Sequence, residues 1–238
     1  MKQYLGIMKV KAEPMTMGEA YERNLLKKGV RPSECETDKA GYLVEYDSYQ
    51  LWQSANVFEK LYKTIEMPLD RMRIEYDELS GRYQKGKEFI DNSQKYPNLD
   101  YLARVLLSAQ NDTQREYCFL LSDRINAMSD KATLLGEFDF GTAIKLLKAG
   151  GAVCRADWRK DEKFVIKQVP AQITGDVIPK MQSLPQIAKD ILMSRKEPHI
   201  DYTNQMLIIY SDGHADSWLP SAEDIFARDW MLVTNIHY

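Results

Sequence analysis

The chain has 238 residues, of which 44% are hydrophobic and 28% charged, and its formal net charge is -3. This length and composition allow one large domain or two to three small ones, and the nearly balanced charge gives no general attraction to nucleic acid polymers or membranes. The three cysteines, Cys35, Cys118 and Cys154, are far apart and odd in number, which argues against a disulfide framework and favours a reducing compartment.

Two further exclusions concern location and metals. Residues 1–7 contain no apolar run long enough for export, and no segment of about 20 apolar residues occurs, so we expect a soluble protein that stays in the cytoplasm where it is made. There is no Cys-x-x-Cys, and His199, His214 and His237 do not form a closely spaced pair. Because zinc needs about four ligands with close spacing, we expect no metal site.

The first region, residues 1–65, is predicted to be a small α+β module. A helical pattern covers residues 18–28, with Gly29 as its expected C-cap. Residues 41–46 and 49–52 predict two strands of a hairpin. A short helix is expected over residues 56–64, because its apolar residues fall on one stripe.

The second region, residues 66–130, is predicted to be a helical hairpin. Apolar residues from Leu69 to Tyr83 repeat at three- and four-residue steps, and Pro97 interrupts the pattern before a second helix with its own apolar side. A hairpin of this kind cannot bury its apolar stripes alone. We therefore expect it to pack on another domain or on a second copy of the chain.

The third region, residues 136–238, begins with an amphipathic helix. Phe140, Ala143, Ile144 and Leu147 lie at i, i+3, i+4 and i+7, and Gly150–Gly151 ends the helix. Strand patterns then cover residues 153–158, 164–169, 205–210, 215–219 and 230–233, with a hairpin turn at Asp212–Gly213. A long loop is expected over 171–185, a helix over 186–194, and a helical turn over 222–227 with Ser221 as its N-cap.

The expected fold class is therefore α+β, with small antiparallel-sheet domains at both ends of the chain joined by a helical hairpin. No catalytic signature occurs: there is no Gly-x-Ser-x-Gly, His-Glu-x-x-His, P-loop or Gly-x-Gly-x-x-Gly. The candidate acid–base residues Asp157, Asp216, Asp224 and Asp229 fall in predicted loops and caps, where carboxylates are usually solvated or structural. We expect neither an enzyme nor a cofactor.

A binding role is better supported. Arg155, at a predicted strand end, can grip a phosphate with its planar guanidinium group, and an aromatic residue such as Trp158 can stack on a base. On a regular strand these two side chains point to opposite faces, unless the strand ends or bulges between them. Ser221 and the amides after it can hold an anion. Each residue also has a structural interpretation: Trp158 and Trp230 as core, Arg155 as an ion-pair partner, Ser221 as a cap.

Residues 136–233 carry a series of short motifs. They are Phe140-Gly141-x-Ala143-Ile144, Leu147-x-x-Gly150, Val153-x-Arg155-x-x-Trp158, Phe164, and Trp218-x-Pro220-Ser221-x-x-Asp224-x-x-Ala227-x-Asp229-Trp230. In order and spacing this series resembles the phage Thoeris anti-defence family of the second kind. The first region, with Gly41-Tyr42-Leu43-Val44-Glu45-Tyr46, resembles a small uncharacterised domain of phage proteins.

The resemblance implies a sponge that acts in the cytoplasm of the infected bacterial host. Family members bind glycocyclic ADP-ribose signals made by bacterial TIR-domain enzymes and hold them without cleavage, and some are linked to cyclic dinucleotides in separate pockets. They are homotetramers with pockets at subunit boundaries. The resemblance implies that the chain would block Thoeris immunity. If it also binds cyclic dinucleotides, it would block CBASS immunity as well. A strong sponge binds at nanomolar strength, about -12 kcal/mol.

Carried over to this chain, the resemblance implies six ligand-binding residues. The stacking and phosphate side would be Arg155, Trp158 and Phe164. Hydrogen bonds to ribose and base would come from Asn204, Ser221 and Asp224, and Asp224 would have to face ribose hydroxyls rather than a pyrophosphate.

Two other functions remain open at this stage. The modular layout and the unpaired apolar stripes of the hairpin are also typical of a phage structural or protein-interaction module with no small-molecule ligand. A nucleotide-cleaving enzyme is the third alternative, and it lacks an evident base or metal.

Overall fold

A computed structural model describes residues 9–129 and 136–234. The expectations for residues 1–7 and for the join at 130–135 lie outside these described residues. The chain divides into two compact units, residues 1–71 and 72–238, which are described separately below. The fold is mixed α and β with antiparallel sheets in both terminal regions, so the expected α+β class is confirmed.

The first unit contains a three-stranded antiparallel sheet in the order β1-β2-β3. The predicted hairpin is confirmed as β2 (Ala40–Glu45) and β3 (Gln50–Ser54), and the predicted short helix is confirmed as α2 (Ala55–Leu61). Strand β1 (Lys11–Thr16) was not predicted, because its sequence has no clear alternation and contains a proline. It pairs with β2 along its full length.

The helix expected over 18–28 is shorter in the structure. Helix α1 covers only Met17–Glu22, and a capping box between Thr16 and Glu19 fixes its start. Asn24 follows the helix with φ 56°, a left-handed conformation that asparagine tolerates. The prediction of Gly29 as the C-cap is therefore wrong: Asn24 turns the chain first.

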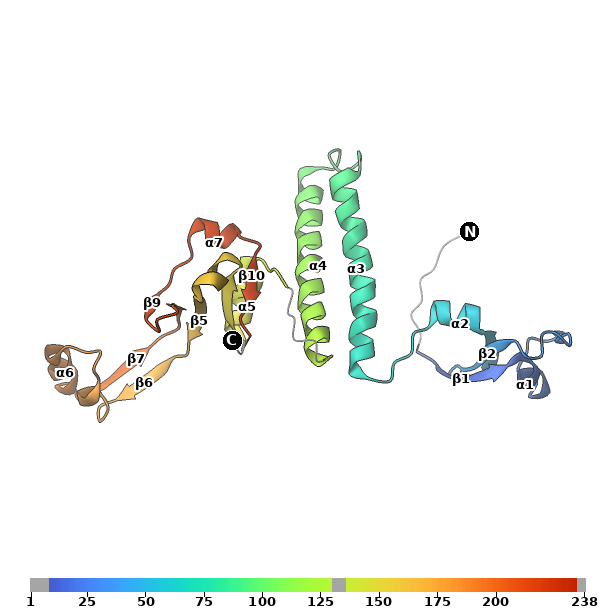
Figure 1. Cartoon of the computed structure of the whole chain (residues 1–238), viewed down its shortest axis with the longest axis horizontal. Helices are drawn as coiled ribbons and strands as arrows, with labels where there is room; N and C mark the ends of the chain where they lie inside the picture. The colour runs from blue at the N-terminus through green and yellow to red at the C-terminus, as the bar shows by residue number, and fades with distance from the viewer. Residues whose placement is uncertain (1–8, 130–135, 235–238) are drawn as a thin grey trace. The chain divides into compact units, whose positions relative to one another are not determined.

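The predicted helical hairpin is confirmed. Helix α3 covers Pro68–Asn92 and α4 covers Tyr101–Met128, with Asp100 accepting a hydrogen bond from the Ala103 amide at 2.9 Å as the N-cap (Figure 1). The later part of α4 packs on the C-terminal domain: Glu116 accepts a hydrogen bond from the Asp139 amide at 2.9 Å. The first turns of α4 instead leave large apolar residues exposed, namely Tyr101, Leu102, Val105 and Leu106.

The C-terminal domain is built on a five-stranded antiparallel sheet in the order β10-β4-β5-β8-β9. The strands are β4 (Ala152–Arg155), β5 (Phe164–Gln168), β8 (Gln205–Ile209), β9 (Ala215–Ser217) and β10 (Trp230–Leu232). Helix α5 (Phe140–Lys148) packs on one face, where Val153, Val165 and Ile208 meet Ala143 and Leu147 in a buried cluster. The amphipathic pattern of this helix therefore predicted its buried side correctly.

The loop expected over 171–185 is wrong in part. Strand β6 (Ala171–Thr174) pairs with β7 (His199–Tyr202) in a separate two-stranded sheet, and neither strand was predicted. Between them lie a 3-10 turn, η2 (Ile178–Lys180), and the predicted helix α6 (Gln186–Met193). Figure 1 shows this group beyond one end of β5. Both strands are four residues long, too short for a clear alternation.

Candidate functional site

The strand expected over 153–158 ends earlier than predicted. Strand β4 stops at Arg155, and a 3-10 turn, η1 (Asp157–Asp161), carries Trp158. The prediction that the strand extends to Trp158 is therefore wrong. Because the strand ends between Arg155 and Trp158, the alternation of side chains between the two faces of a strand does not apply to this pair. Both side chains approach Trp230.

Four aromatic rings form a cluster at this corner of the domain. Trp230 is fully buried at its centre, with the rings of Phe140, Trp158 and Trp218 at centroid distances of 5.6, 5.4 and 5.9 Å. Such tilted and edge-on pairs stabilise the core beyond the area they bury. Trp230 is thus a core residue, whereas Trp158 is only partly buried, and the Lys163 ammonium lies 5.2 Å from its ring centroid.

Arg155 lies beside Trp230 and is held by two carboxylates. Its Nη1 donates to Asp224 Oδ1 at 3.1 Å, its Nε donates to Asp229, and only 12% of its side chain is exposed. Burial alone would lower the pKa of the Arg155 guanidinium, but its bonds to Asp229 and Asp224 outweigh that effect and raise this pKa above its usual value. The guanidinium therefore stays charged and fixes the segment from 224 to 229 against β4.

Asp224 has a second task in helix α7 (Ala222–Phe226). Its Oδ2 accepts hydrogen bonds from the Ser221 amide and hydroxyl at 2.9 and 2.8 Å, and the Ser221 Oγ accepts one from the Asp224 amide at 3.1 Å. The predicted N-cap at Ser221 is thereby confirmed as a capping box. The Asp224 carbonyl also accepts a hydrogen bond from the Trp230 indole at 3.0 Å, so Arg155, Ser221 and Trp230 all meet at one residue.

Large apolar residues flank helix α7 on the surface. Leu219 and Phe226 are each 84% exposed, and Ile225 is 44% exposed. Isolated apolar residues on a surface are common, but three around one five-residue helix mark a surface suited to a ligand or another chain.

The other face of the sheet is also apolar. Residues paired across strands lie on the same face, so Phe164 and Ile209 point away from α5, as do Ile166 and Leu207. All four are only partly buried. Phe164 therefore belongs to this second face and not to the buried cluster beneath α5.

Within one chain, Asn204 lies away from the corner around Trp230. It precedes β8 and is exposed, and the register pairs Gln205 with Gln168 at one end of β5 and Ile209 with Phe164 at the other. Asn204 and Ile209 are five positions apart along the chain, a distance of roughly 17 Å in a strand. One chain thus gathers Arg155, Trp158, Ser221 and Asp224, with Phe164 on the adjoining sheet face and Asn204 at the far end.

Sequence reasoning missed two members of this corner. Asp229 was noted only as a possible acid, and Lys163 was not considered. The signal for Lys163 was the density of cations after Trp158, at Arg159, Lys160 and Lys163.

Two features of the described residues bear on other classes of protein. Within residues 9–129 and 136–234, no three His, Cys, Asp or Glu side chains are grouped so that they could hold a metal ion. Among the helices of that same part of the chain, none combines the length and the apolar character needed to cross a bilayer.

Comparison with known families identifies two regions of the chain. Residues 138–233 match the Tad2-like family, described as the Thoeris anti-defense 2-like domain, and residues 66–127 match the Sequestin family. No curated protein matches the chain. The first match covers the sheet and the corner around Trp230, and the second covers nearly the whole helical hairpin. Both matches support a sequestering, anti-defence role for the two regions that they cover.

Proposed function

We propose that this protein binds a glycocyclic ADP-ribose signal in its Tad2-like domain and holds it without cleavage, so that Thoeris immunity is blocked in the cytoplasm of the infected host. The observation that carries the proposal is the corner around Trp158 and α7. It combines a partly exposed indole, a neighbouring cation and exposed apolar side chains within the region that matches the Tad2-like family. A nucleotide needs such a mixture, because its bases stack and its phosphates are charged.

The six site residues take different parts in this proposal. Trp158 and Phe164 supply the stacking surface. Arg155 already binds two carboxylates, so its main task is to position α7, and Lys163 beside Trp158 adds a cation for the phosphates. Ser221 and Asp224 face the ribose hydroxyls.

In the proposed site, Asn204 comes from a different subunit than the other five residues. Because it lies roughly 17 Å along the strand from the level of Phe164, we propose that a neighbouring copy supplies it in a homotetramer. The apolar second face of the sheet, with Ile166, Leu207 and Ile209, supports such an assembly, since partly exposed apolar faces are stabilised when another chain covers them.

The retained ligand tests the proposal directly. The protein is incubated with glycocyclic ADP-ribose, freed of unbound ligand by desalting and heat-denatured, and the supernatant is analysed by mass spectrometry. Intact ligand is expected. Chemically altered ligand would show that the protein is an enzyme. If no ligand is retained, the result would favour an interaction module, an alternative that the exposed Tyr101, Leu102 and Leu106 of α4 support. A parallel incubation with a cyclic dinucleotide tests the second ligand class.

A tryptophan pair provides the matched variants. Trp158→Ala should abolish the thermal stabilisation by glycocyclic ADP-ribose and leave the oligomer intact in light scattering. Trp52→Phe changes an indole in the other compact unit and should leave the ligand effect unchanged. Full stabilisation of the Trp158 variant would remove this residue from the site.

A further inference from the structure

One face of helix α4 contacts the C-terminal domain. The contact residues recur at i, i+4, i+7 and i+11, which is the spacing of a single helix face. They are Asp112, Glu116, Phe119 and Asp123. The ring of Phe119 lies edge-on to that of Phe138 at a centroid distance of 6.4 Å, and the Asp123 carboxylate accepts a hydrogen bond from the Gly136 amide at 3.3 Å. Specific side-chain contacts therefore join the hairpin to the domain.

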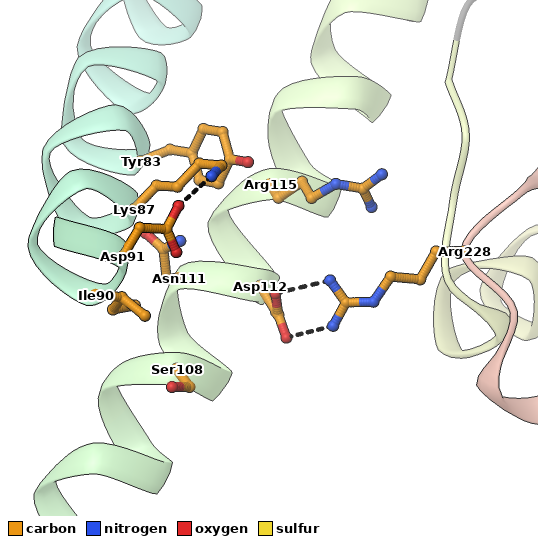
Figure 2. Close-up of a pocket in the computed structure, with 9 residues that line it drawn as sticks. All are labelled: Tyr83, Lys87, Ile90, Asp91, Ser108, Asn111, Asp112, Arg115 and Arg228. Carbon is orange, nitrogen blue, oxygen red and sulfur yellow. Dashed lines mark hydrogen bonds and ion pairs between the residues drawn. The ribbon is translucent and has the colours of Figure 1, made fainter. Parts of the chain in front are cut away.

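Two of these contacts lead to the residues around Trp230. Phe138, which meets Phe119, exchanges two backbone hydrogen bonds with Trp230, at 2.7 and 3.0 Å. Arg228, two residues before Trp230, crosses to α4, where Asp112 accepts hydrogen bonds from both of its terminal nitrogens at 3.2 and 2.8 Å (Figure 2). Helix α4 thus contacts both a backbone partner of Trp230 and the chain that leads into it.

Residues 224–230, which we call the corner segment, are bound to two parts of the structure. Asp224 and Asp229 bind Arg155 of β4, whereas Arg228 binds the hairpin. The last residue of the segment is buried, but the two apolar residues that follow Asp224 are exposed. A segment with few buried apolar contacts opens easily, so its conformation depends on these polar anchors.

The proposed signal site depends on where the corner segment lies. Asp224 belongs to that site and is bonded to both Ser221 and Trp230. The ring of Trp158 lies against that of Trp230, at a centroid distance of 5.4 Å. Because the backbone links neighbouring residues rigidly, a shift of Arg228 is passed on to the residues beside it. Side chains that are already held in the binding geometry lose less freedom when the ligand binds, which raises the affinity.

We propose that Asp112 and Arg228 are positioning residues of the signal site, because their ion pair lets the helical hairpin hold the corner segment in its ligand-binding geometry. This inference rests on the proposed function of the corner around Trp158. Neither residue of the pair has to contact the ligand. Asp112 lies in the region that matches the Sequestin family, and Arg228 lies in the region that matches the Tad2-like family. The hairpin therefore tunes the affinity of the Tad2-like domain for its signal.

The exposure of the ion pair limits the size of this effect. The side chains of Arg228 and Asp112 are 59% and 47% exposed, and ion pairs in that setting are weak. An equilibrium that depends on such a pair changes by at most about fivefold when the pair is lost. Loss of the pair should lower the melting temperature by at most about 4 °C, so the variants remain folded.

The affinity of the full-length protein for glycocyclic ADP-ribose, measured by isothermal titration calorimetry, tests the positioning role. Asp112→Ala and Arg228→Ala should each weaken binding about three- to fivefold, and the double variant should be no weaker than either, because both changes remove one interaction. Removal of the Asp112 charge would by itself favour an anionic ligand, so weaker binding in this variant cannot come from long-range charge. Asp112→Glu keeps the carboxylate and should retain the affinity. The matched control is Asp77→Ala, at an exposed position of α3, which should bind like the wild-type protein.

Unchanged or tighter binding in Asp112→Ala would overturn the proposal, as would losses that multiply in the double variant. Hydrogen exchange without ligand separates this inference from the proposed function. The amides of residues 222–230 should exchange faster in Asp112→Ala than in the wild-type protein or in Asp77→Ala. Equal exchange in all three proteins would overturn the positioning role. If the wild-type protein binds no signal, the proposed function fails instead, and faster exchange in Asp112→Ala would still support the hold of the hairpin on the corner segment.

Discussion

Replacement of Arg155 by methionine offers the sharpest test of how the C-terminal domain is held together. The Arg155 side chain is 12% exposed, and the side chains of its partners Asp224 and Asp229 are 13% and 31% exposed. Methionine keeps much of the aliphatic volume but leaves two carboxylates without a cation. Breaking a buried pair costs about 3–5 kcal/mol, and the partial exposure of Asp229 places the expected loss near the lower end, at about 3 kcal/mol. For the compact unit of residues 72–238, that loss corresponds to a melting temperature lower by about 6–12 °C.

Tryptophan fluorescence during urea unfolding measures this loss. Of the four tryptophans, Trp158, Trp218 and Trp230 lie in one cluster, so a Trp52→Phe background restricts the signal to the C-terminal domain. All variants are compared in that background, at equal protein concentration.

Neutral partners provide the control. If the loss comes from unpaired charge, then Asp224→Asn and Asp229→Asn, introduced together with Arg155→Met, should recover a large part of it. A loss below about 1 kcal/mol for Arg155→Met alone would refute the reasoning, because the carboxylates would not depend on the guanidinium. Failure of the neutral partners to recover stability would show that lost packing against Trp230, and not charge, is responsible.

Three further predictions concern other parts of the chain. The hydrogen bond with Tyr62 raises the pKa of Tyr46 to about 12; stability that Tyr46 contributes is therefore complete below about pH 10 and lost as the pH rises towards 12, and Tyr62→Phe should bring the midpoint of its ultraviolet titration back towards 10. Alanine substitutions at Arg228 and Asp112, combined in a double-mutant cycle of urea unfolding, should give a coupling of at most about 1 kcal/mol, because both side chains are about half exposed. Ser221→Ala should cost about 1 kcal/mol in the same assay by removing the capping box, whereas Ser221→Asp should retain most of the stability.

The sequence predicted those elements whose signal is local. Helix α5 was found because four apolar residues repeat at helical spacing, and α7 because Ser221 is a favoured N-cap residue. Strand β8 was found because it is a continuous apolar run before a turn at Gly213. In each case the residues that determine the element are neighbours along the chain.

Strands β6 and β7 show where this reasoning ends. They are joined by 24 intervening residues, and each is stabilised mainly by pairing with the other. A four-residue strand that contains one or two apolar residues carries no periodicity of its own, so only the partner strand makes it recognisable. The same holds for β1, whose pairing with β2 spans residues 17–39, which include helix α1.

The corner around Trp230 depends on long-range contacts of the same kind. Arg155 is separated from Asp224 by 69 residues and from Asp229 by 74, so no spacing rule links them. The residue types nevertheless limited the outcome, since a guanidinium at a strand end was expected either to grip a phosphate or to form an ion pair. The structure shows the ion pair. A nucleotide that binds here must then either leave this pair intact and use Lys163 beside Trp158, or take the place of Asp224 and release the cap of α7. Displacing Asp224 breaks the capping box as well as the ion pair. Binding that leaves the Arg155–Asp224 pair intact therefore costs less free energy.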